Sequence, residues 1–150
     1  MLAPFQFSVV PGQEWRTQYW VRWVLDTYYT LTADGVPGNS DFGELEAWAV
    51  WACLGLYPLT ATPGGTYILS SPCFKNVSLS TGGGAAPFLN IVAHNFSASS
   101  VYIVNATLNG VALPSPFVNH STLLAGAPSL LEYFLTDTPS LWGGGTPASL

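Results

Sequence analysis

A change in hydrophobic period near Pro58 is the feature that most constrains how this chain can fold. Before Pro58, apolar side chains recur at spacings of three and four residues, which is the period of one face of an α-helix. After Pro58, apolar and polar side chains alternate, which is typical of β-strands with one buried face. The sequence therefore predicts an α+β protein in which helices come first and strands follow.

Two helices are predicted before the change of period. The first runs from Glu14 to about Thr30, and one of its faces carries Trp20, Trp23, Val24, Tyr28 and Leu31. Val21 and Leu25 make the opposite face apolar too, so we expect this helix to pack on more than one side. The second helix runs from Asp41 to about Leu56, with Gly55 near its end.

Asp41 stands where the second predicted helix begins. Its side chain can accept hydrogen bonds from free N–H groups of the first turn, and Glu44, three residues on, completes a capping-box pattern. The helix dipole also favours a negative charge at that position. From spacing alone, a helix cap is the favoured interpretation of Asp41.

The second part of the chain carries a series of predicted strands. The first four cover Thr66–Ser70, Asn76–Ser80, Phe88–His94 and Val101–Leu108. Asn109-Gly110 is a strong signal for a type I′ hairpin, and a last strand spans Leu130–Leu135. We therefore divide the chain into helices at 1–58, an antiparallel β segment at 59–138 and a flexible Pro/Gly-rich tail at 139–150.

Charge is scarce in this chain, and that excludes some partners. Charged residues make up 7% of the sequence and hydrophobic ones 49%, with a net charge of −5, whereas about 25% of residues are charged in a typical domain. Three basic residues form no patch for phosphates, so we expect no nucleic-acid partner. The longest apolar run, Ala47 to Pro58, has about 12 residues against the roughly 20 of a membrane helix, so we expect no membrane span.

Four N-glycosylation sequons indicate a secreted, extracellular glycoprotein; they begin at Asn76, Asn95, Asn105 and Asn119. The N-terminal residues lack the basic region of a signal peptide, so we expect the signal to lie outside this chain. Cys53 and Cys73 could form one disulfide in that compartment. Cys53 could equally be a small buried side chain of the second helix.

Five tryptophans gather in or beside the two predicted helices: Trp15, Trp20, Trp23, Trp48 and Trp51. Two helices share one seam, which cannot bury that much aromatic surface. We expect the cover to come from the sheet, from a second copy or from further helices. Expressed alone, the chain is predicted to expose apolar helix faces and to associate.

Six segments of the chain resemble the C-terminal part of glycoside hydrolase family 92: VPGQEWRTQ (10–18), DTYY (26–29), DGVPGNSDFGELEAW (34–48), LGLYP (54–58), SSPCF (70–74) and ATLNG (106–110). The resemblance runs from about Pro4 to Gly143, and its most specific part lies around Pro37 to Trp48. Members of that family are calcium-dependent, inverting exo-α-mannosidases with a β-sandwich packed on an (α/α)₆ barrel. The resemblance implies two helices from the end of that barrel, followed by an antiparallel β-sheet or sandwich segment.

The resemblance gives roles to residues of the loop before the second helix. Asp41 falls on the position of the general base, and Asn39 on that of a residue that assists it, although Asn39 is equally well explained as a turn residue. Glu44, Trp48 and Gln13 are candidate substrate-binding residues. Each also has an ordinary structural interpretation: the second half of a capping box, a core tryptophan and the start of a helix.

Several positions depart from the family pattern. The general acid is a glutamate far upstream of the base, so we expect it outside this chain; Glu14 is too close in sequence to be that residue. Ser40 stands where an acidic residue is usual, and Leu2 where a histidine is expected. Calcium is the cofactor that the resemblance implies, with most ligands elsewhere, and we assign no metal ligand here. His94 and His120 have no third ligand nearby.

Two functions follow from the sequence. The leading one is part of an inverting exo-α-mannosidase-like glycoside hydrolase acting on mannose-containing glycans, with the remainder of the hydrolase polypeptide as its partner and with no activity in this chain alone. The alternative is a non-catalytic glycan-binding or structural β module supported by the helices. Ser40, Leu2 and the missing acid favour the module, whereas the Gly38–Gly43 turn, with Asn39 and Asp41 in place, favours the hydrolase.

Overall fold

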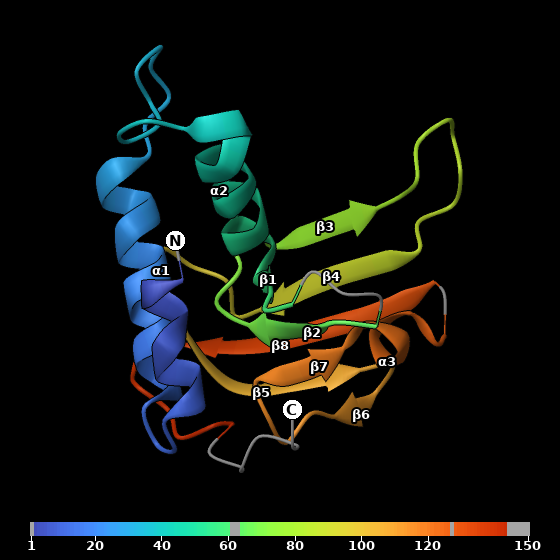
Figure 1. Cartoon of the computed structure of the whole chain (residues 1–150). Coiled ribbons are helices and arrows are strands. Elements are labelled where there is room, and N and C mark those ends of the chain that lie inside the picture. The colour runs from blue at the N-terminus through green and yellow to red at the C-terminus, as the bar shows by residue number, and fades with distance from the viewer. Residues whose placement is uncertain (1, 61–63, 127, 144–150) are drawn as a thin grey trace.

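The computed structural model of this chain describes residues 2–60, 64–126 and 128–143. Its elements are, in chain order, η1 (Ala3–Val9), α1 (Glu14–Tyr28), η2 (Asp41–Gly43), α2 (Glu44–Leu54), β1 (Leu56–Pro58), β2 (Thr66–Leu69), β3 (Asn76–Leu79), β4 (Leu89–His94), β5 (Tyr102–Leu108), β6 (Val111–Ala112), β7 (Phe117–Asn119), α3 (His120–Leu124) and β8 (Ser129–Thr136). In Figure 1, α1 and α2 stand next to each other beside the strands. The predicted α+β class is confirmed.

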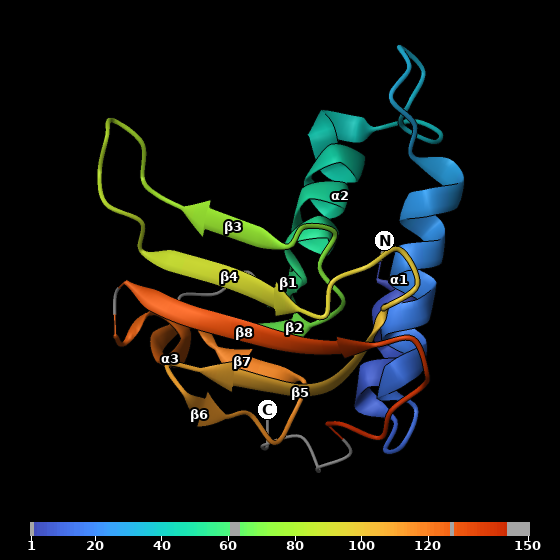
Figure 2. The ribbon, with the colours of Figure 1, turned by 180° about the vertical axis from the view of Figure 1, so that it is seen from behind.

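The strands form two sheets. One has three strands in the order β1-β2-β7, and the other has five in the order β3-β4-β8-β5-β6. Figure 2 shows β3, β4, β8 and β5 side by side from behind. Neighbouring strands are antiparallel except β4 and β8, which are parallel. The larger sheet is therefore mixed, where the sequence predicted antiparallel pairing throughout, because the chain returns to β4 only after β5, β6, β7 and α3.

The predicted strands and hairpin are found in place. Asn109 and Gly110 have φ angles of 51° and 79°, and a type I′ turn needs positive φ at both central residues. The turn joins β5 to β6, with Leu108 opposite Val111. The short strands β1 and β7 and the helix α3 were not predicted, because each is too short to show a period.

The buried face of α1 lies opposite the face that carries Trp20 and Trp23. Val21 and Leu25 are 0% and 6% exposed, whereas Trp20 and Trp23 are 37% and 39% exposed. Polar side chains help to select this face, since the buried Gln18 Oε1 accepts a hydrogen bond of 2.8 Å from the backbone N–H of Ile103 in β5. The sequence predicted that this helix packs on more than one side. Within the described residues, only one face of α1 is buried.

The main core lies between the two sheets and beneath the end of α2. Its fully buried members include Leu56, Leu69, Leu89, Ile91, Ile103, Leu131, Tyr133 and Leu135. Burying such a side chain stabilises a fold by roughly 1.5–3 kcal/mol. The hydroxyl of Tyr133 donates a hydrogen bond of 2.7 Å to the carbonyl of Gly55, so the larger sheet is tied directly to the end of α2.

Trp142, which lies in the tail predicted to be flexible, is packed against the rest of the chain. Trp142 Nε1 donates a hydrogen bond of 2.9 Å to the carbonyl of Leu113, and its ring packs against the core. The rest of the predicted tail, 144–150, lies outside the described residues. None of the helices in the described ranges combines the length and the apolar character that crossing a membrane requires.

Candidate active site

The loop that joins α1 to α2 begins with a compact turn. The N–H of Thr30 donates to the carbonyl of Gly35 at 2.9 Å, and the N–H of Gly35 donates to the carbonyl of Thr32 at 3.0 Å. A Cβ on Gly35 would lie 2.0 Å from the carbonyl oxygen of Thr30, so a side chain does not fit there. The turn fixes the base of the loop from which Asn39 and Asp41 project.

The helix α2 begins at Glu44, three residues later than predicted. Asp41–Gly43 forms a short 3₁₀ turn, and Gly43, with a φ of 80°, is the N-cap of α2. The predicted capping box of Asp41 and Glu44 is therefore wrong. The two residues after Asp41 both have left-handed backbone conformation, which turns the chain before the helix starts and removes Asp41 from the cap position.

Ser40 supplies the local contacts that the sequence assigned to Asp41. Its Oγ accepts a hydrogen bond of 3.3 Å from the N–H of Leu45 and donates one to the carboxylate of Glu46. The hydrogen bond from Ser40 lowers the pKa of Glu46. The serine that departs from the family pattern thus holds the first turn of α2.

Asp41 is left exposed to solvent at the end of this loop. Its backbone carbonyl accepts the N–H of Glu44, but in the ranges that the structure describes its carboxylate makes no hydrogen bond or ion pair. A carboxylate whose lone pairs are not used by the protein can accept a proton from a bound water. The carboxylate of Asp41 is therefore open to solvent.

Asn39 and Glu44 share the exposed surface around Asp41. Asn39 precedes it by two residues, and Glu44 opens α2 directly after the turn. The charge of Glu44 contributes, after burial, to raising the pKa of Tyr57. The loop thus brings together three of the predicted site residues by their proximity in sequence.

Trp48 is packed as a core residue. It is 2% exposed, stacks on Tyr29 with ring centroids 5.7 Å apart, and meets the edge of Phe5 at 6.2 Å. A sugar platform needs an open ring face, so of the two interpretations of Trp48 this geometry fits the core one.

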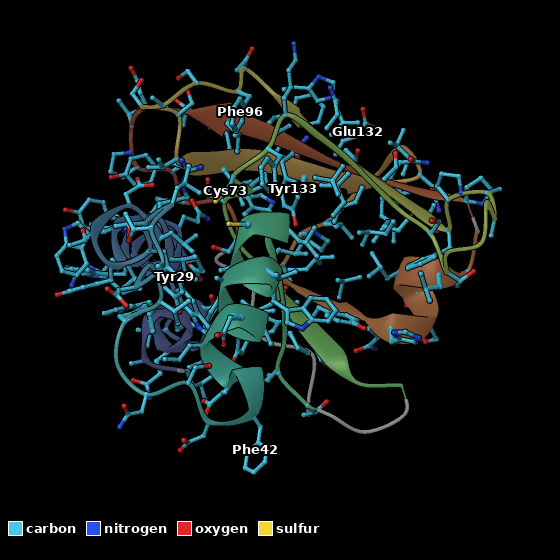
Figure 3. The ribbon with its side chains drawn as sticks, turned by 90° about the horizontal axis from the view of Figure 1, so that it is seen from above. Tyr29, Phe42, Cys73, Phe96, Glu132 and Tyr133 are labelled. Carbon is cyan, nitrogen blue, oxygen red and sulfur yellow. The ribbon has the colours of Figure 1, made fainter. Side chains whose placement is uncertain are left out.

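Tyr29 positions the loop, a role that the sequence did not reveal. It follows the end of α1, and its hydroxyl donates a hydrogen bond of 3.0 Å to the carbonyl of Leu45 in the first turn of α2. Figure 3 shows Tyr29 between the two helices. The signal in the sequence was the second tyrosine of the DTYY segment, just beyond the helical period.

Phe42 is a second residue that the sequence did not single out. It lies between Asp41 and Gly43 with a φ of 57°, and its side chain is fully exposed. Figure 3 shows it pointing away from the rest of the molecule. A phenylalanine in this backbone region costs about 1–3 kcal/mol, and such strain is common at functional sites. A strained, exposed aromatic residue therefore lies next to Asp41.

Gln13 lies at the opposite end of the helical pair from this loop. It is the N-cap of α1, and a helix of 15 residues is about 22 Å long. The neighbouring Glu14 is 2% exposed and accepts a hydrogen bond of 3.2 Å from the N–H of Gly12. The structure therefore does not bring Gln13 to Asp41, and it shows Glu14 as a buried residue of the helix start.

A cluster of ionisable metal ligands is not found in the part of the chain that the structure describes. No group of three or more His, Cys, Asp or Glu side chains that could hold a metal ion occurs among residues 2–60, 64–126 and 128–143. His94 is instead 2.9 Å from Glu132, whose pKa is lowered by that contact and by a hydrogen bond from Thr107. These residues do not fit a calcium site, and we derive no catalytic step through the ion.

Comparison with known proteins identifies relatives along nearly the whole chain. The model of the glycosyl hydrolase family 92 catalytic domain matches residues 1–136. A protein of Arthroderma benhamiae named an uncharacterized secreted glycosidase is 36% identical over 119 residues, which is 76% of this chain and 14% of that protein.

Solved structures of the same family share the fold. An inverting mannosidase of family GH92 from Bacteroides thetaiotaomicron is 30% identical and superimposes with a TM-score of 0.81 over 97% of this chain. A GH92 alpha-mannosidase from the same organism, in complex with mannoimidazole, is 22% identical with a TM-score of 0.84 over 98% of this chain. This chain spans 19% of each of those chains.

Proposed function

This chain belongs to glycosyl hydrolase family 92, and from that premise we propose that it is part of an inverting exo-α-mannosidase with Asp41 as its general base. The observation that carries the proposal is the position of Asp41. It stands exposed before α2, its carboxylate is not used as a helix cap, and the cap contacts come from Ser40. A merely structural aspartate at a helix start would be engaged by the backbone N–H groups.

In the proposed reaction, the carboxylate of Asp41 takes a proton from a water molecule. The water oxygen attacks the anomeric carbon of the terminal mannose from the face opposite the leaving group, and the bond to the leaving oxygen breaks with inversion. A second carboxylic acid protonates the leaving oxygen. That acid would come from the remainder of the polypeptide, roughly 6.5–9.5 Å from Asp41, and calcium, the cofactor that the family resemblance implies, would also be held mostly by residues outside this chain.

Residues around Asp41 would position the water and the sugar. The Asn39 side chain can orient the water through one hydrogen bond. Glu44 can bind sugar hydroxyls as an acceptor. The ring of Phe42 offers an apolar face for the C–H face of a sugar, which would account for its strained backbone.

The remainder of the hydrolase polypeptide is the proposed partner of α1. Exposed aromatic residues form a ladder along this helix, with ring centroids 5.1 Å apart for Tyr19 and Trp20, 5.3 Å for Trp20 and Trp23, and 5.5 Å for Trp23 and Tyr28. We call this surface the aromatic stripe. A stripe of this kind is suited to pack against another helix, and we expect this chain alone to be inactive.

Secretion and glycosylation belong to the same proposal. Asn76, Asn95 and Asn119 are exposed in the structure, and Asn105 is half-buried within β5. An oligosaccharide can be attached only to an accessible side chain. We therefore expect a higher glycosylation occupancy at the three exposed sequons than at Asn105.

The alternative function is a glycan-binding β module, and the cavity in the β half gives it little support. That cavity has a volume of about 470 Å³ and is lined mainly by apolar side chains, among them Trp51, Tyr67, Phe88 and Leu123. Sugar hydroxyls need several hydrogen-bonding partners. The lining therefore favours packing or an apolar ligand over a saccharide.

The test is the activity of the full-length hydrolase carrying Asp41→Asn. We expect kcat on α-1,2-mannobiose with calcium to fall by about 10²–10⁴-fold, with KM nearly unchanged. Asp34→Asn, on the same loop, is the matched control and should keep full activity. A variant D41N with more than about a tenth of the normal kcat would overturn the assignment, and turnover by the isolated chain above its own D41N control would contradict its expected inactivity.

A further inference from the structure

Cys53 and Cys73, twenty positions apart in the sequence, are neighbours in the fold. Cys53 lies in the last turn of α2, and Cys73 in the connection between β2 and β3. The backbone N–H of Cys73 donates a hydrogen bond of 2.9 Å to the carbonyl of Cys53. Figure 3 shows the Cys73 sulfur beside the end of α2, next to the other sulfur atom in view. Two residues joined by a backbone hydrogen bond lie close together, and a disulfide bridges Cα atoms that are roughly 4.4–6.8 Å apart.

The connection that carries Cys73 is held in place by contacts that do not involve sulfur. The N–H of Ser70 donates to the carbonyl of Gly55 at 2.8 Å, and Nη1 of Arg22 donates to the carbonyl of Pro72 at 2.8 Å. A Cβ on Gly55 would lie 2.7 Å from the Ser70 oxygen, so the close approach depends on glycine. The two thiols are therefore brought together before any bond forms.

The two thiols differ in acidity. The thiol of Cys73 donates a hydrogen bond to the sulfur of Cys53, which lowers the pKa of Cys53 and raises that of Cys73. Both residues remain partly exposed, so a small thiol reagent can reach them. Cys53 is the better nucleophile of the pair because the thiolate is the reactive form.

We propose that Cys53 and Cys73 form a disulfide in an oxidising compartment, with a small-molecule disulfide such as oxidised glutathione as the oxidant. The Cys53 thiolate attacks one sulfur of the oxidant, forms a mixed disulfide and releases one glutathione thiolate. Cys73 then loses its proton to water and attacks the Cys53 sulfur, which releases the second glutathione. The two cysteines lose two electrons and two protons, and the oxidant is reduced to two thiols.

The disulfide links the helical and the β parts of the chain. It closes a loop of about twenty residues through β1 and β2, which restricts the unfolded chain. It also fixes the end of α2 beside Gly55, the residue that already accepts the hydrogen bond from Tyr133. This role is independent of Asp41 and stands whether or not the proposed mannosidase activity is found.

In the experiment, the 150-residue chain is equilibrated with mixtures of reduced and oxidised glutathione, and free thiols are then trapped with N-ethylmaleimide. The mass of the intact protein is measured by mass spectrometry. We expect a species without adducts, lighter by two hydrogen atoms, and an equilibrium constant for oxidation at least about 100-fold larger in native buffer than in concentrated urea. The single variants Cys53→Ser and Cys73→Ser should each take up one maleimide or one glutathione.

A stability measurement tests the same conclusion. Reduction should lower the Tm of the wild-type chain by about 5–10 °C, and the double variant Cys53→Ala/Cys73→Ala should show no dependence on reductant. Two maleimide adducts on the native chain after exposure to oxidised glutathione would overturn the proposal. So would a lasting glutathione adduct on Cys53, or equal oxidation constants in native buffer and in urea.

Discussion

The β part of the molecule buries its apolar side chains, whereas the helical part leaves several large aromatic side chains exposed. In the larger sheet, apolar and polar positions alternate so that Leu131 and Tyr133 are fully buried. In the helical part, the strongest apolar stripe of α1 faces outward, with Trp23 and Tyr28 at 39% and 49% exposure. The polar side chain of Gln18, on the opposite face of α1, is buried instead.

The two parts differ in how much apolar surface they leave exposed. The sheets enclose a fully buried core. The helical pair buries a second core with Phe5 and Ile68, but among the described residues Trp20 and Trp23 stay exposed. The proposed catalytic loop belongs to the helical part. The proposed chemistry and the proposed contact with the rest of the hydrolase thus both lie in the part whose aromatic side chains are exposed.

The largest effect is expected in the β core. Leu131→Ala should lower the free energy of unfolding by about 2–5 kcal/mol, because it removes buried methyl groups and leaves a cavity. The matched control is Leu130→Ala, one position along β8 on the exposed face, which should cost less than about 1 kcal/mol. Urea unfolding followed by tryptophan fluorescence measures both. Equal losses of stability in the two variants would contradict the structure, in which Leu131 is buried and Leu130 is exposed.

A smaller effect, of opposite sign, is expected in the catalytic loop. Phe42→Gly should raise the free energy of unfolding by about 1 kcal/mol, because glycine adopts the left-handed backbone conformation without strain. Phe42→Ala keeps the strain and is the control. If both variants lose stability equally, the phenylalanine is held by packing and the loop is not strained.

The smallest effect on stability is expected on the aromatic stripe. Replacing Trp20 and Trp23 by lysine should change the free energy of unfolding by no more than about 0.5 kcal/mol each, but it should lower the apparent mass of the chain in sedimentation or light scattering. Thr81→Lys, at an exposed site after β3, is the charge-matched control. A wild-type chain that is already monomeric at the same concentration would remove the reason to assign a partner to this surface.

The fold was predictable where the pattern is local. The alternation of side chains located β4, β5 and β8, because period two follows directly from strand geometry. Asn109-Gly110 predicted a type I′ turn, because these two residue types adopt the positive φ angles that such a turn needs. The parallel pairing of β4 with β8 was not predictable, because it depends on which distant strands meet.

The candidate site was predictable in part. The segment from Pro37 to Trp48 pointed to Asp41 and Asn39 through its resemblance, whereas the helix cap predicted at Asp41 is wrong. A D-x-x-E pattern matches a capping box, but the left-handed backbone of Phe42 and Gly43 shifts the helix start to Glu44. Spacing in a sequence does not reveal such a turn when one of its residues is a phenylalanine.

By itself, the sequence determined the α+β class, the positions of the longer strands and the family, since hydrophobic period and short motifs are properties of neighbouring residues. Tertiary structure decided which face of α1 is buried, that Gln13 lies far from Asp41, and that Cys53 meets Cys73. The physical reason is common to all three. Burial and proximity depend on the elements that pack against a residue, and those elements come from distant parts of the chain.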